Sequence, residues 1–139
     1  MGCWSACSNP SRTDSRAVGS HPANLALRFV LELAALFGLG WWGWSLTDGW
    51  ARFALAGLFV VGAAGIWGTF AVPDDPSRSG GAPVPVRGWI RLLIELLVFC
   101  GGVIGLTAGE QAPIGIALLI GVVIHYLLSL DRIRWLLER

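Results

Sequence analysis

Charged residues are scarce in this sequence, at 14 % of the chain, and lysine is absent altogether. A soluble domain carries about 25 % charged residues, so a globule with so few would lack the polar surface that water requires. The net charge is only +1, which gives no positive field for binding nucleic acid. With 55 % hydrophobic residues and a mean hydropathy of +0.65, the composition predicts an integral membrane protein, whose partner is the lipid bilayer and not a nucleic acid.

Signatures of common catalytic and cofactor sites are also missing. The sequence has no H-E-x-x-H, no G-x-S-x-G, no glycine-rich phosphate loop and no cysteine–histidine spacing of a zinc site. Cys3 and Cys7 have no companion pair, and Cys100 falls in an apolar run, where it is expected to pack as a small hydrophobe. We therefore expect no enzyme activity, no catalytic residue, no metal and no cofactor.

The first 23 residues are polar and rich in Pro, Gly and Ser, without the apolar run of about 7–15 residues that marks a signal peptide. They are expected to form a disordered tail before one transmembrane domain at residues 24–139. Four apolar runs follow, each close to the roughly 20 residues that a membrane-spanning helix needs, at about 25–44, 52–72, 89–106 and 113–130. The sequence thus predicts an all-α fold, a four-helix membrane bundle made of two helical hairpins.

The arginines predict the orientation of this bundle. All ten basic residues are arginines, and nine of them fall on the side that holds the termini and the long loop between the second and third runs. Arg52 alone falls on the other side, near Asp48 and Glu110. Because basic residues near helix ends are retained in the cytoplasm, we expect both termini on the cytoplasmic side of a bacterial inner membrane. Trp41, Trp42, Trp44 and Trp50 would lie at the outer interface.

Two of the apolar runs contain the same pair of charges. In "LRFVLELAAL" (residues 27–36), Arg28 and Glu32 stand four residues apart, and "IRLLIELLVF" (residues 90–99) repeats the pattern with Arg91 and Glu95. Residues i and i+4 share one face of a helix. Each glutamate would lie about 10 Å inside the membrane, at about 1.5 Å of rise per residue. A carboxylate at such a depth needs protein or water around it, and a partner.

The offset of 63 residues between the two pairs indicates a duplicated hairpin, a parallel repeat about the membrane normal. We expect the first and third helices to pack together, with Arg28, Glu32, Arg91 and Glu95 in one polar network near the inner face. In addition to pairs along each helix, Arg28 would pair with Glu95 and Arg91 with Glu32. Two interpretations stay open: a network that only fixes helix register, or a substrate or proton site.

A second polar stripe marks the fourth apolar run, where one helical face carries Gly121, His125, Ser129 and Arg132. His125 would lie about 7.5 Å from the cytoplasmic end, close to the depth of the two glutamates. His125 and Ser129 could then belong to a protonatable layer with Glu32 and Glu95, or the histidine could be a hydrogen-bonded packing residue. Since both carboxylates already have arginines, we expect no metal there.

The segments "NLALRFVLELAAL", "WGTFAVPDDP" and "RLLIELLVF" resemble the YrdB family of small four-helix bacterial membrane proteins, classed as a domain of unknown function. The resemblance covers about residues 24–130 and implies a four-span inner-membrane protein without catalytic residues. The positions that match the family pattern are Arg28, Glu32, Arg91 and Glu95, the stretch 67–70, Pro73 and Pro76. Asp74 and Asp75 stand where such proteins often carry basic residues, which argues against a lipid-phosphate contact in this loop.

Two functions remain after these steps. We favour a non-catalytic membrane component whose arginine–glutamate network serves structure or partner binding, because each glutamate has its own arginine. The alternative is a small proton-coupled transporter or efflux unit that uses Glu32, Glu95 and His125. Small-residue stripes would let helices approach closely, either within the bundle or in a homodimer or another membrane assembly. These stripes are Gly101, Gly105 and Gly109, and the pair Ala64 and Gly68.

Overall fold

The computed structural model describes residues 22–73, 75 and 83–138. These residues form five helices and a pair of two-residue parallel strands. The helices are α1 (Pro22–Ser45), α2 (Ala51–Thr69), α3 (Gly88–Ala108), α4 (Ala112–Leu128) and α5 (Leu130–Leu137), and the strands are β1 (Phe70–Ala71) and β2 (Val84–Pro85). Most of the predicted N-terminal tail lies outside the described residues, and its last two residues belong to α1.

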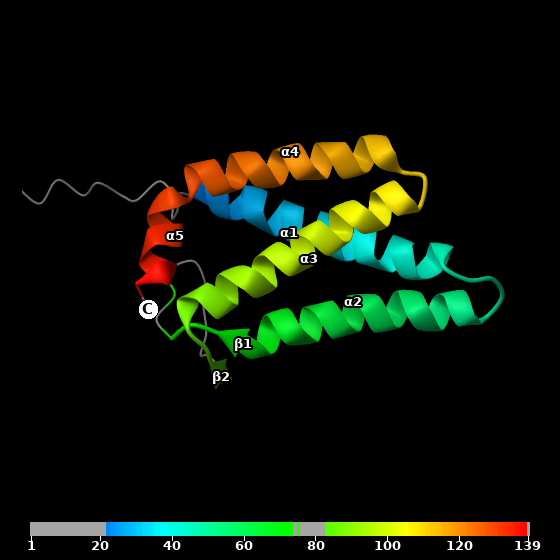
Figure 1. Cartoon of the computed structure of the whole chain (residues 1–139), viewed down its shortest axis with the longest axis horizontal. Coiled ribbons are helices and arrows are strands. Elements are labelled where there is room, and N and C mark those ends of the chain that lie inside the picture. Colours follow the sequence, from blue (N-terminus) through cyan, green and yellow to red (C-terminus); the bar gives the residue numbers. More distant parts are fainter. Residues whose placement is uncertain (1–21, 74, 76–82, 139) are drawn as a thin grey trace, which may run out of the picture.

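Helices α1 to α4 are elongated along a common direction, with α1 and α3 crossing in the middle (Figure 1). Helix α1 contacts α2, α3 and α4, and its contact with α3 is the most extensive in the fold, as expected for the first and third helices. The α1–α2 and α3–α4 turns lie at one end of the molecule. Helix α5, the strands and the start of α1 lie at the other end (Figure 1). Most of the buried charged side chains, among them Arg28, Arg91, Glu95 and Arg132, belong to elements at the second end.

The all-α prediction is confirmed, with one more helix than expected. Helices α1, α2 and α3 are each long and apolar enough to cross a membrane. Helix α4 is followed by α5 at an angle of 71°, and this bent pair would count as a fourth span by length and composition. Two of the predicted runs end early. The second stops at Thr69, where β1 begins, and the fourth stops at Leu128, where the chain turns into α5.

Small residues set the distance between α1 and α3. A Cβ added to Gly102 would lie 2.6 Å from the Cα of Ala35, so only glycine fits there. A Cβ on Gly105 would collide with the backbone of Gly38, and Trp41 donates a hydrogen bond from Nε1 to the carbonyl of Gly109 at 2.8 Å. The predicted glycine stripe of α3 thus serves contacts within the chain. Gly68, in contrast, has open space around it.

The core lies between α1, α3 and α4. Its buried members are Leu31, Ala35, Val98, Phe99, Leu106, Leu118 and Val122. Helix α2 buries none of its residues and contributes only partly buried side chains, among them Ala63 and Trp67. Helix α2 is therefore held by α1 along its length and by polar contacts at its C-terminal end, which belong to the site described next.

Candidate functional site

A cluster of charged side chains lies where α1, α3, α5 and the loop after β1 meet. We call it the charge cluster. Its centre is Glu95 of α3, whose side chain is 2 % exposed. The other members are Arg28, Glu32, Asp75, Arg91 and Arg132. Among the described residues, this is where positive and negative side chains are buried together.

Three guanidinium groups from three helices bind the Glu95 carboxylate. Arg28 Nη2 lies 2.8 Å from Oε1, and Arg91 Nε lies 3.3 Å from the same oxygen. Arg132 contacts both oxygens, with Nη2 2.9 Å from Oε1 and Nη1 3.0 Å from Oε2. The two-point contact of Arg132 is the planar geometry that makes arginine–carboxylate pairs strong and directional.

Two further carboxylates complete the cluster. Arg132 Nη2 also lies 3.0 Å from Oδ2 of Asp75, which is 4 % exposed. Arg28 Nε lies 2.8 Å from Oε1 of Glu32, its i+4 neighbour, which is 27 % exposed. The three arginines and three carboxylates carry equal and opposite formal charge. This balance is what allows so many ionised groups to leave solvent, since an unpaired buried charge is strongly destabilising.

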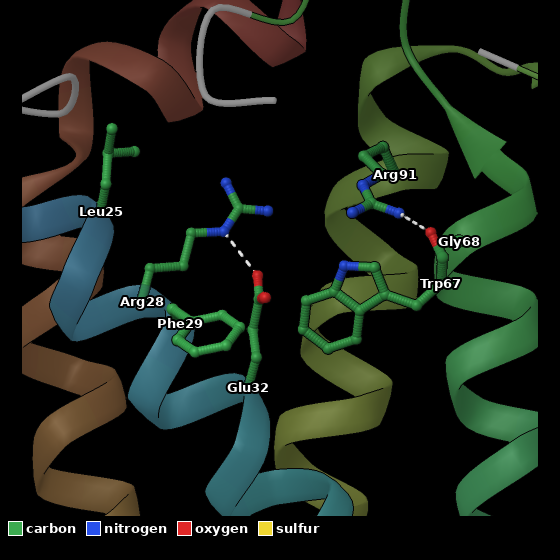
Figure 2. A pocket seen from close by; sticks show the side chains of 7 residues that line it. All are labelled: Leu25, Arg28, Phe29, Glu32, Trp67, Gly68 and Arg91. Atoms are coloured by element: carbon green, nitrogen blue, oxygen red, sulfur yellow. Dashed lines mark hydrogen bonds and ion pairs between the residues drawn. The ribbon is translucent and has the colours of Figure 1, made fainter. Parts of the chain in front are cut away.

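Arg91 also closes the C-terminal end of α2. Its Nη1 donates to the carbonyls of Trp67 at 2.6 Å and Phe70 at 2.8 Å, and its guanidinium carbon lies 5.5 Å from the centre of the Trp67 ring. The last carbonyls of a helix have no partner within the helix and carry its negative dipole end, so a cation there is favourable. Figure 2 shows Arg91 reaching from α3 to the end of α2, opposite Arg28 and Glu32 on α1.

Arg132 connects helix α5 to the cluster through its ion pairs with Glu95 and Asp75. Burial by itself lowers the pKa of Arg132, but the hydrogen bonds and the charges of Glu95 and Asp75 outweigh burial and raise the pKa above its ordinary value. The side chain therefore stays protonated and holds α5 across the ends of the longer helices. Gly88 of α3 gives α5 room, because a Cβ there would collide with the backbone of Leu136.

His125 and Ser129 lie beside the cluster in a separate chain of hydrogen bonds. Asn24 Nδ2 donates to Ser129 Oγ at 2.8 Å, and Asn24 Oδ1 lies 3.0 Å from His125 Nδ1. Since the amide oxygen can only accept, Nδ1 of His125 carries the proton. His125 is 3 % exposed. In the ranges 22–73, 75 and 83–138, no group of three His, Cys, Asp or Glu side chains lies close enough to hold a metal.

All four residues of the expected polar network meet in the charge cluster, but they do not form the symmetric pairs expected from the repeat. Arg28 joins Glu95 across the α1–α3 interface, whereas Arg91 contacts Glu95 of its own helix and the carbonyls of α2. The sequence did not indicate three further partners in and beside the cluster, Asn24, Asp75 and Arg132. Arg132 could have been found, because its spacing from His125 and Ser129 predicted a shared polar face.

Comparison with known proteins agrees with the resemblance noted from the sequence. Residues 26–124 match the family described as "Protein of unknown function (DUF2568)". The chain is 41 % identical over 116 residues to "Uncharacterized protein YrdB" of Bacillus subtilis (strain 168), which covers 84 % of this chain and 94 % of that protein. No solved structure matches. The chain belongs to the DUF2568 family, and the YrdB resemblance is confirmed.

We predict that the two glutamates of the repeat differ in their effect on stability. Glu95→Gln leaves three arginines around a neutral amide, and a buried pair broken on one side costs about 3–5 kcal/mol. Glu32→Gln removes a partly exposed ion pair, and the loss of this pair costs about 1 kcal/mol or less. Denaturant unfolding in detergent micelles measures the loss of unfolding free energy in both variants. Glu110→Gln, at the opposite end of the molecule, is the control. Equal losses for Glu32→Gln and Glu95→Gln would contradict the central position of Glu95.

Proposed function

We propose that the chain is a non-catalytic integral membrane protein of the bacterial inner membrane. In this proposal, α1 to α4 form a membrane bundle, and the charge cluster holds its cytoplasmic end together. The observation that carries the structural role is the environment of Glu95, which has three arginine partners and is almost fully buried. A carboxylate neutralised in this way is suited to fixing helices relative to one another and poorly suited to releasing or binding protons.

The membrane location is supported by the surface of the helices. Large apolar side chains point outward along α1 to α4, and α2 buries no residue at all. On α1 alone, Phe29, Val30, Leu33 and Phe37 are between 52 % and 60 % exposed. Soluble monomers rarely expose apolar patches of this extent, because such patches drive association in water. In hydrocarbon the same surface is favourable.

The orientation is supported by the distribution of charge and aromatic residues over the two ends. Arg52 belongs to the end with the two short turns, whereas the other described arginines, at positions 28, 87, 91, 132 and 134, belong to the cluster end (Figure 1). The positive-inside rule then favours a cytoplasmic cluster end. At the opposite end, Trp44 packs edge-on against Phe53 with ring centres 4.9 Å apart, and Trp50 is 87 % exposed, as aromatic side chains at an interface would be.

The transporter alternative needs a protonatable group that is accessible and not already bound. Glu95 is held by three cations, and Nδ1 of His125 is hydrogen-bonded to Asn24. Glu32 is the most accessible of the three, but one of its oxygens is bound by Arg28. The contacts therefore favour the structural role over proton coupling.

Cysteine labelling tests the orientation. In a variant whose three native cysteines are replaced by serine, we expect a cysteine at position 48 or 110 to react with a membrane-impermeant maleimide in spheroplasts. A cysteine at position 138 should react only after the membrane is opened, because it lies at the cluster end. Labelling of position 138 in intact spheroplasts would contradict the proposed orientation.

A flux measurement in proteoliposomes separates the two functions. We expect proton leak no faster than in protein-free liposomes, with or without an imposed pH gradient, since the carboxylates of the cluster are already neutralised. Glu32→Gln is the matched variant, because it removes the most accessible carboxylate while leaving Glu95 intact. Flux in the unmodified protein that disappears in Glu32→Gln would favour the transporter.

A further inference from the structure

A pocket of about 330 Å³ opens beside the charge cluster, between the first turns of α1 and the end of α2. Arg28, Glu32 and Arg91 line it together with Leu25 and the rings of Phe29 and Trp67. Figure 2 shows that the two arginines approach from opposite sides, with the Glu32 carboxylate and the Trp67 ring below them. The pocket therefore has a positive upper part, one negative group and aromatic walls.

Two polar groups in this pocket have unused hydrogen-bonding capacity. Glu32 is bound through Oε1 by Arg28, and no residue in the described part of the chain binds its other oxygen. Trp67 offers its carbonyl to Arg91, but its indole N–H has no acceptor among the residues at 22–73, 75 and 83–138. A free acceptor and a free donor thus line the same pocket. A ligand that carries both a cation and an anion would satisfy them together.

The surrounding charges restrict the class of ligand that the pocket can bind. A simple cation at Glu32 would be repelled by Arg28 and Arg91, and a simple anion near the arginines would be repelled by Glu32. A zwitterion avoids both penalties, with its anionic group near Arg28 and the Trp67 N–H and its ammonium group at Glu32. We propose that this pocket binds the headgroup of a phosphatidylethanolamine-type lipid, with the phosphate at Arg28 and Trp67 and the ammonium at Glu32.

The lipid source follows from where the pocket lies, and this step rests on the proposed membrane location. The pocket is bounded by the first three turns of α1 and the last turn of α2, so it lies at the cluster end of the bundle, near one membrane surface. Phe29, which lines it, is 60 % exposed and would continue into the acyl region. A lipid of the inner leaflet can therefore reach the pocket from the side, with its headgroup inward.

Native mass spectrometry of the detergent-purified protein tests the assignment, with phosphatidylethanolamine, phosphatidylglycerol and soluble phosphoethanolamine as probes. We expect one phosphatidylethanolamine to bind more tightly than phosphatidylglycerol. Glu32→Gln should weaken the binding of phosphatidylethanolamine about tenfold, which is the contribution of one charge-assisted hydrogen bond. The binding of phosphatidylglycerol should stay unchanged. Trp67→Phe removes the indole N–H donor but keeps an aromatic ring. It should weaken the binding of both lipids, because both carry the phosphate that this donor would contact.

Glu110→Gln is the matched control, since it makes the same substitution at the far end of the molecule. Unfolding of each variant in the same detergent shows whether a loss of lipid binding is caused by a loss of protein stability. Equal binding of the two lipids to the unmodified protein, or a preference that survives Glu32→Gln, would overturn the assignment. Soluble phosphoethanolamine binding as tightly as the lipid would overturn the lipid source. Failure of the membrane proposal would appear separately, as a protein absent from the membrane fraction.

Discussion

The carboxylate of Glu95 is 2 % exposed and lies in a helix whose other face is apolar, so it must be neutralised for the chain to fold. Neutralising it requires cations to converge from elsewhere in the chain. Arg28 arrives from α1 and Arg132 from α5, while Arg91 comes from one turn earlier in α3. In the proposed membrane location, apolar helices would gain little from associating with one another in lipid, so such polar contacts and close packing would decide the arrangement.

Several other features depend on this convergence. The 71° bend between α4 and α5 brings Arg132 against Glu95, and Asp75 binds Nη2 of Arg132, the nitrogen that also contacts Glu95. Arg91 connects the same cluster to the C-terminal end of α2. This contact matters for α2 because the helix has no buried residue. The close approach of α1 and α3 at Ala35 and Gly102 places the backbones near enough for Arg28 to reach across. Packing and charge pairing thus support one another.

Much of this arrangement could be predicted from the sequence. The apolar runs located four of the helices, and the repeated Arg-x-x-x-Glu spacing identified four residues of the cluster. The spacing could not show that the two copies differ. Arg28 crosses to the other helix, whereas Arg91 turns to the carbonyls of α2, because the C-terminal end of α2 lies next to α3 only in the folded chain.

The features that the sequence did not predict were missed for physical reasons. Asp75 lies in a Pro-rich loop, where an aspartate is normally solvated, yet it is buried and pairs with Arg132 of α5, 57 positions away in the sequence. Asn24 stands at the start of α1, and its contacts come from residues more than 100 positions away in the sequence. Helix α5 was not predicted because its eight residues mix Asp131, Arg132 and Arg134 with apolar side chains, so they form no apolar run of their own, and no proline or glycine marks the bend before them. Long-range contacts of this kind leave no local pattern.

The central claim is that Glu95 and the arginines around it form one coupled unit, and a double-mutant cycle between Glu95 and Arg28 tests it most directly. The double change Glu95→Gln with Arg28→Gln leaves Arg132 paired with Asp75, Arg91 on the carbonyls of α2, and Glu32 in reach of solvent. We expect the double variant to be more stable than Glu95→Gln alone, with a coupling free energy of about 2 kcal/mol or more in detergent unfolding. Strictly additive losses would contradict the account.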